Sequence, residues 1–260
     1  MTSLAQAIGA HALDGFLALL ALLLATTFLL AWSARRVAER RRRTEHPFAR
    51  LGMGVVLGFA VIVAAGWVFA EIAERIGDGG ALGRVDQAFM AAVLASTSAG
   101  AARAFGWVTR LGDPPTLFVV SLLGVGLLWW RGERLLAVGL IGAVGGNALL
   151  NPALKRVFER VRPLQENGLP LVDGWSFPSG HSSGALVTYG MLAYVLLRSL
   201  PRGWHLPGVL LAVTLAFSVG ASRVFVQAHF ASDVVAGFAS GAAWLTACIV
   251  SVEWARRRRG

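Results

Sequence analysis

Seven long apolar runs decide what this sequence can fold into. They are Leu13–Trp32, Leu51–Ala70, Pro115–Trp130, Leu135–Leu150, Ser182–Leu197, Pro207–Ala221 and Val234–Val252. Several are shorter than the ~20 residues that a bilayer crossing needs, so we expect their helices to continue into the flanking polar residues. With 56% hydrophobic residues and a mean hydropathy of +0.63, the chain is too apolar for a soluble domain of its size. No alternating barrel pattern occurs, and we predict an all-α, polytopic membrane helix bundle of about seven transmembrane helices.

The arginines between the apolar runs predict the topology. They gather in four segments, which are Arg35 to Arg50, Arg131 with Arg134, Arg198 with Arg202, and Arg256 to Arg259. Seven crossings place all four segments on one side of a cell (inner) membrane, and the positive-inside rule makes that side the cytoplasm. We therefore expect the N-terminus outside and the C-terminus in the cytoplasm. The net charge of +10 is explained by these clusters, so we expect membrane lipids and no nucleic acid as partners.

One stretch between two apolar runs, Ser222 to Asp233, carries charged groups that are costly beside a membrane and therefore suggest function. His229 and Asp233 are four residues apart, so on a helix they would share a face. A carboxylate that fixes one ring nitrogen of a histidine leaves the other free as a base or nucleophile. Arg223 precedes the pair and is suited to bind an oxyanion such as phosphate.

Two further motifs lie earlier in the chain. Lys155 and Arg162 are seven residues apart, so on one helix they would lie on nearly the same face, about 10 Å apart along the axis, until Pro163 ends the helix. The run Pro178-Ser179-Gly180-His181 opens a later apolar run. A helix start of this kind offers N–H donors to a phosphate, with a histidine placed to transfer a proton.

These motifs fall in connections that the topology places on the outer face. A third outer connection, Glu71 to Pro114, contains apolar residues at helical spacing, Leu82, Val85, Phe89 and Val93. We expect them to form a helix that lies in the membrane interface. The sequence thus predicts a site on the extracytoplasmic side.

Together the three motifs resemble the type 2 phosphatidic acid phosphatase (PAP2) superfamily. Its signature has three parts, Lys-x6-Arg-Pro, Pro-Ser-Gly-His and Ser-Arg-x5-His-x3-Asp, and this chain matches every spacing. The resemblance covers about Leu51 to Val252 and implies a six-helix phosphatase core. We therefore expect residues 1–50 to form an extra N-terminal transmembrane helix with a basic cytoplasmic loop, and residues 51–260 to form the core.

The resemblance also implies a role for each matched residue. His229 would be the nucleophile that forms a phosphohistidine, Asp233 its orienting partner, and His181 the general acid that then activates water. The implied phosphate-binding residues are Lys155, Arg162, Ser179, Gly180 and Arg223. Cations and helix N–H groups can neutralise a transferring phosphoryl group without a metal. Because the outer loops show no acidic cluster spaced for two metals, we expect neither a metal nor a cofactor.

The implied activity is hydrolysis of a lipid phosphate or pyrophosphate. Candidate substrates are phosphatidic acid, phosphatidylglycerol phosphate and polyprenyl (undecaprenyl) pyrophosphate. Two alternatives stay open: a phosphotransferase that moves phosphate from a polyprenyl pyrophosphate to a lipid or glycan, and a non-catalytic lipid-binding or transport protein. Soluble vanadate-dependent haloperoxidases share the signature, but seven apolar spans argue against that class. The headgroup and the oligomeric state stay open on sequence grounds.

Overall fold

The computed structural model describes residues 1–41, 47–76, 80–163 and 174–258. These residues form α-helices and two short 3₁₀ turns and contain no strand, which confirms the all-α class. The helices are α1 (Thr2–Ala10), α2 (Ala12–Arg41), α3 (Pro47–Ala73), α4 (Ala81–Ser96), α5 (Ala99–Thr109), α6 (Pro114–Trp130), α7 (Arg134–Phe158), α8 (Gly180–Ser199), α9 (His205–Phe225) and α10 (Ala231–Arg257).

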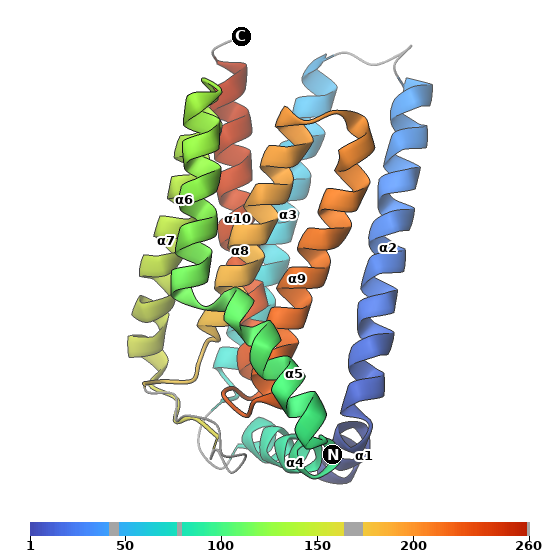
Figure 1. Cartoon of the computed structure of the whole chain (residues 1–260), viewed down its shortest axis with the longest axis vertical. Helices are drawn as coiled ribbons and strands as arrows, with labels where there is room; N and C mark the ends of the chain where they lie inside the picture. Colours follow the sequence, from blue (N-terminus) through green and yellow to red (C-terminus); the bar gives the residue numbers. More distant parts are fainter. Residues whose placement is uncertain (42–46, 77–79, 164–173, 259–260) are drawn as a thin grey trace.

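The long helices α2, α3 and α6 to α10 run along the long axis of the molecule, while α1 and α4 lie across one end (Figure 1). We call this the site end; it also holds the N-terminus, the start of α6 and the turn between α9 and α10. The C-terminus and the connections α6–α7 and α8–α9 lie at the opposite end (Figure 1). The three connections predicted to share one face of the membrane therefore do meet at one end of the bundle.

Five helices in the described part of the chain are long and apolar enough to cross a membrane: α2, α3, α7, α9 and α10. Helices α4 and α5 are bent by 116° relative to each other, and they would add a sixth span only if the two together were counted as one crossing. Helix α6 is apolar but shorter than the five. Helix α8 is not among the five, because its first turns carry the polar residues of the Pro-Ser-Gly-His motif and the hydroxyls that follow it. The count of seven crossings stays a prediction.

Helix α4 confirms the helix expected in the outer connection from Glu71 to Pro114. Its partner α1 was not predicted, and the two pack closely: a Cβ atom added at Gly9 would lie 2.7 Å from the Cβ of Ala92. Ser96 Oγ also donates a hydrogen bond to the Gly9 carbonyl at 3.0 Å. The two helices therefore cover the site end as one unit.

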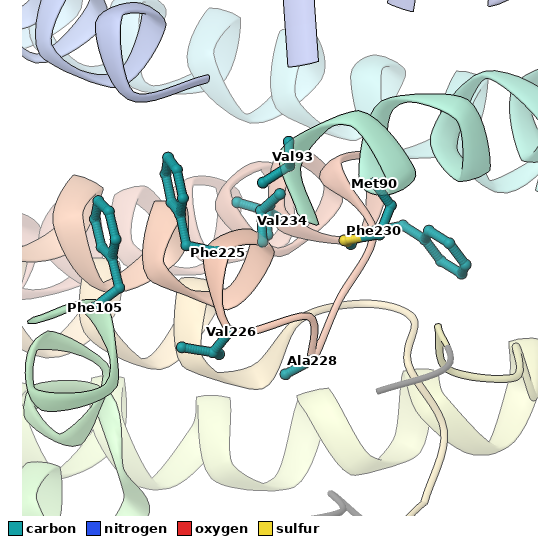
Figure 2. Packing of buried hydrophobic residues seen from close by; sticks show 9 residues of the cluster. Met90, Val93, Phe105, Phe225, Val226, Ala228, Phe230 and Val234 are labelled. Carbon is teal, nitrogen blue, oxygen red and sulfur yellow. The ribbon is translucent and has the colours of Figure 1, made fainter. Parts of the chain in front are cut away.

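A buried apolar cluster holds the turn between α9 and α10 in place (Figure 2). The rings of Phe105 on α5 and Phe225 on α9 stack with their centroids 4.0 Å apart. Met90 and Val93 of α4 pack against the same cluster, which includes Phe230. The turn is thus packed against apolar side chains of α4 and α5, and it carries the predicted nucleophile.

Close contact between α8 and α10 positions the start of α8. A Cβ atom added at Gly237 would lie only 2.5 Å from the Ser179 carbonyl oxygen, so glycine is required for this approach. The backbone N–H of Ser179 donates to the Asp233 carbonyl at 3.0 Å. The Pro-Ser-Gly-His motif is thereby tied to the first turn of α10.

Candidate active site

One cavity of about 800 Å³ collects the predicted site residues at the site end. The residues that line its polar part are Lys155, Arg162, Gly180, His181, Arg223 and His229. They come from α7, the segment after it, α8, α9 and the α9–α10 turn. Ser179 and Asp233 lie behind this lining, and both are fully buried. The structure thus brings all three motifs to one place.

His229 lies in the turn just before α10, and Asp233 lies in the first turn of that helix. The pair is therefore joined by the helix start and does not share a helix face. Arg162 Nη1 is 3.2 Å from His229 Nε2, and because a guanidinium can only donate, Nε2 is the acceptor. In the neutral ring the proton then sits on Nδ1, which faces Asp233 Oδ2 at 3.6 Å. Nε2 is left as the nitrogen that can attack.

The surroundings of His229 keep its ring neutral. Burial lowers the pKa of His229 well below its ordinary value, and the nearby cations Arg223, Arg162 and Lys155 lower it further. A neutral imidazole is the form that can act as a nucleophile. The fully buried ring is therefore ready for attack at neutral pH.

The helix-face argument for Lys155 and Arg162 was wrong, although both residues reach the cavity. Helix α7 ends at Phe158, because Glu159 adopts a left-handed conformation with φ 43°, so Arg162 lies beyond it. Arg162 Nε donates to the Gly174 carbonyl at 2.8 Å, and its Nη1 donates to the Ala228 carbonyl at 2.7 Å. The irregular segment after α7 therefore carries Arg162 to the histidine.

The Pro-Ser-Gly-His motif starts α8 as predicted. Ser179 is the N-cap, and its Oγ accepts hydrogen bonds from Ser182 N at 3.4 Å and from Ser182 Oγ at 3.0 Å. A Cβ atom added at Gly180 would lie 2.9 Å from Asn151 Oδ1, so a larger residue would push against α7. The Ser179 hydroxyl oxygen is thus already an acceptor at the helix start. Direct phosphate binding by Ser179 stays a prediction.

Arg223 and His181 complete the polar end of the cavity. Arg223 Nη1 donates to Thr109 Oγ1 at 2.7 Å, while its buried Nε has no partner among the described residues. His181 Nε2 lies 2.8 Å from Asp113 Oδ1. Since a carboxylate accepts, Nε2 carries the proton, and Nδ1 of His181 remains available for proton exchange.

The PAP2 superfamily model matches residues 136–257, which include every position of the three motifs. This match covers just under half of the chain, and that part is similar to the PAP2 superfamily. Phosphatidylglycerophosphatase B of Bacillus subtilis (strain 168) is 38% identical to it over 143 residues, which cover 52% of this chain and 66% of that protein, just under two thirds. The crystal structure of a transmembrane PAP2-type phosphatidylglycerolphosphate phosphatase from Bacillus subtilis matches with a TM-score of 0.65 at 29% identity, covering 76% of this chain and 96% of that one. Both matches are named as phosphatases.

Two site features lie outside the PAP2 signature and were missed by sequence reasoning. The first is Asp113, the partner of His181, which is the N-cap residue of α6 yet makes no side-chain capping bond. Asp is a favoured N-cap, so its position before Pro114 indicates only a helix start. Nothing in the sequence signals the contact with His181, 68 residues away.

The second missed feature is a buried ion network behind Asp233. Arg160 Nη1 donates to Asp233 Oδ1 at 2.6 Å, and Arg160 Nη2 donates to Asp86 Oδ2 at 2.8 Å. Ser232 joins through its hydroxyl, which contacts both Arg160 and Asp86. The side chains of Arg160, Asp86 and Asp233 are 7%, 5% and 0% exposed. This network connects α4 to the carboxylate that faces His229.

The rest of the cavity is mostly apolar, with the polar side chains of Ser121, Asn147, Asn151 and Thr188 among its lining. It continues from the cations along α6, α7 and α8, and its walls include Leu117, Phe118, Leu122, Ile141 and Val144. A phosphate at the histidines could therefore carry an apolar tail into the same cavity. The described residues contain no group of three or more His, Cys, Asp or Glu placed to hold a metal, and metal independence stays a prediction.

Proposed function

We propose that this chain is a membrane-embedded, metal-independent phosphatase that acts on a lipid phosphate or pyrophosphate through a phosphohistidine on His229. One observation carries the proposal: a single cavity has two histidines and three cations at one end and an apolar wall at the other. A phosphorylated lipid has the same division between charged head and apolar tail. The unpaired buried Nε of Arg223 supports an anion at the polar end, because a buried donor needs an acceptor.

The first chemical step follows from the positions of the two rings. The phosphate replaces His229 as the acceptor of the Arg162 bond, and Nε2 of His229 attacks phosphorus. The P–N bond forms while the bond to the leaving oxygen breaks, and the His181 ring, protonated on both nitrogens at the start, gives its Nδ1 proton to that oxygen. Arg162, Arg223 and Lys155 neutralise the charge on the equatorial oxygens.

The second step reverses the role of His181. Its neutral ring removes a proton from water, and the water oxygen attacks phosphorus as the P–N bond breaks. The products are inorganic phosphate and a dephosphorylated lipid, with His229 and His181 returned to their starting states. Asp233 holds the Nδ1 side of His229, and its 3.6 Å separation in the unliganded protein is expected to shorten as charge develops on the ring.

Turnover and trapping of the intermediate test this mechanism. His229→Ala and His181→Ala are each expected to lower phosphate release by at least ~10²-fold, while His205→Ala at the opposite end leaves it unchanged. With ³²P-labelled lipid, alkaline quenching should recover an acid-labile phosphoprotein from the wild type and none from His229→Ala. Full phosphate release by His229→Ala would refute the assignment.

A panel of lipids separates the remaining readings. Phosphatidylglycerol phosphate comes first, because two similar proteins are named for it; phosphatidic acid and undecaprenyl pyrophosphate follow. Labelled product formed from an added lipid or glycan acceptor, in place of free phosphate, would show a phosphotransferase. Specific lipid binding with no release from any lipid would show a non-catalytic protein.

We also propose that the site end faces the extracytoplasmic side and that α2 is an addition to the PAP2 core. Arginine-rich connections at the opposite end support the first point, and none of the span of α2 is buried, which supports the second. With Cys248 replaced by alanine, Ala95→Cys at the site end should react with an impermeant maleimide in intact cells. Gly203→Cys should react only after permeabilisation, and the reverse pattern would invert the topology.

A further inference from the structure

Two hydroxyl groups in the wall of the cavity lack hydrogen-bond partners. Ser121 on α6 and Thr188 on α8 line the cavity and are 8% and 1% exposed. Neither Ser121 Oγ nor Thr188 Oγ1 has a partner among the described residues. Serine and threonine in a helix usually return this bond to their own backbone, as Thr214 does to Leu210. Two unpaired hydroxyls in one wall therefore point to an acceptor that the protein itself does not supply.

The two hydroxyls lie at the same depth. A Cβ atom added at Gly184 would lie 3.0 Å from Leu117 Cδ1, so these positions of α8 and α6 face each other. Both helices start at the site end and run in the same direction (Figure 1). Thr188 lies four residues after Gly184 and Ser121 lies four residues after Leu117, so each is about 6 Å further along its own helix axis. Together they form a pair of donors at one level of the wall, one turn beyond Asn147, which also lines the cavity.

The depth of this pair indicates which acceptor it would meet. Thr188 lies seven residues beyond His181, about 10 Å along α8. In a diacyl lipid the acceptors nearest the tails are the ester carbonyls, whereas a polyprenyl chain has no acceptor there. With about 1.2 Å per bond in an extended chain, a carbonyl five bonds from phosphorus, as in phosphatidic acid, reaches only about 6 Å.

A carbonyl eleven bonds from the cleaved phosphorus, as in phosphatidylglycerol phosphate, reaches about 13 Å. The Cβ of His181 leans toward the start of α8, so a phosphate at its ring lies somewhat more than 10 Å from Thr188. We propose that Ser121 and Thr188 bind the acyl ester carbonyls of a glycerophospholipid that carries the cleaved phosphate on its headgroup. This inference rests on the proposed function and names its substrate class.

The test compares ester-linked and ether-linked lipids, because an ether lacks the carbonyl oxygen. The proteins are the full chain, its Ser121→Ala/Thr188→Val double variant, and Thr214→Val as a control whose hydroxyl is already bonded within α9. The substrates are diester and diether phosphatidylglycerol phosphate and undecaprenyl pyrophosphate. Two hydrogen bonds of ordinary strength predict that the wild type prefers the diester in kcat/KM by about tenfold.

The double variant should lose this preference by slowing on the diester alone, by about tenfold, with the other two substrates unchanged within about twofold. Its melting temperature should not fall, because the lost hydroxyls have no hydrogen-bond partner among the described residues. Equal turnover of diester and diether by the wild type, a preference that survives in the double variant, or a lower melting temperature would each overturn the inference. If the wild type released phosphate from no lipid, the proposed function would fail. The carbonyl site would still be tested by comparing how tightly the His229→Ala variant binds the diester and the diether lipid.

Discussion

Replacing Asp113 with asparagine tests how a histidine among cations keeps its proton. Burial lowers the pKa of His181, Arg223 lowers it further, and the hydrogen bond that the ring donates to Asp113 raises it. A general acid must carry the proton that it donates. Together with the negative charge of a bound phosphate, Asp113 is the group that favours the protonated ring. Asparagine keeps an acceptor at this position but removes the charge.

The expected effect is about fivefold. A hydrogen bond to a charged partner contributes about 1.5–3 kcal/mol, and the 2.8 Å contact between His181 and Asp113 is of that kind. The Asp113 side chain is 42% exposed, so solvent screening reduces the charge contribution to about 1 kcal/mol. Since each 1.36 kcal/mol is tenfold in rate, kcat/KM for a lipid phosphate should fall about fivefold.

The assay compares two leaving groups. A lipid alkoxide must be protonated as it leaves, whereas p-nitrophenolate leaves without a proton. Because kcat/KM reports the steps up to the first irreversible bond cleavage, Asp113→Asn should lower it for the lipid and leave it nearly unchanged for p-nitrophenyl phosphate. The alkaline limb of the lipid profile should also move to lower pH, because losing the carboxylate lowers the pKa of His181.

Two outcomes would contradict this reasoning. An equal loss on both substrates would mean that Asp113 only supports the structure, and no loss on either would mean that its charge does not matter. The substitution removes no helix cap, because the Asp113 side chain caps nothing. Glu133→Gln is the matched control, since Glu133 occupies the same N-cap position on α7 at the opposite end and likewise makes no capping bond.

Further predictions concern the supports of the site. Arg160→Gln leaves two buried carboxylates without their cation, so it should lower the free energy of unfolding by about 3–5 kcal/mol and lower activity as well. The control Arg156→Gln, at an exposed position, should change neither stability nor activity. Thermal unfolding measures the stability of both variants, and phosphate release measures their activity. Gly180→Ala should lower turnover because its Cβ would press on Asn151. Adding Asn151→Ala should restore part of the rate, and a double variant no faster than the single one would show that the strain lies elsewhere.

Much of the site could be read from the sequence because the PAP2 signature is local. Lys155, His181, Arg223 and His229 sit at fixed spacings inside three short motifs, and each motif lies at a helix end that hydropathy alone locates. Two helix-face arguments were nevertheless wrong, because neither Lys155 and Arg162 nor His229 and Asp233 lie on one helix. Arg162 reaches the cavity because Glu159 turns left-handed and the chain leaves the helix, a conformation that no sequence rule marks for glutamate.

By itself the sequence determined the all-α membrane class, and it predicted which side of the membrane each end of the chain faces and which groups react. These follow from the length of apolar runs, the placement of arginines and the chemistry of single motifs. The tertiary structure alone decided that Asp113 would hold His181 and that Asp86 would share Arg160 with Asp233. These contacts join residues 68 to 74 positions apart. Their formation depends on how α4 and the start of α6 pack against the site end, which no local pattern encodes.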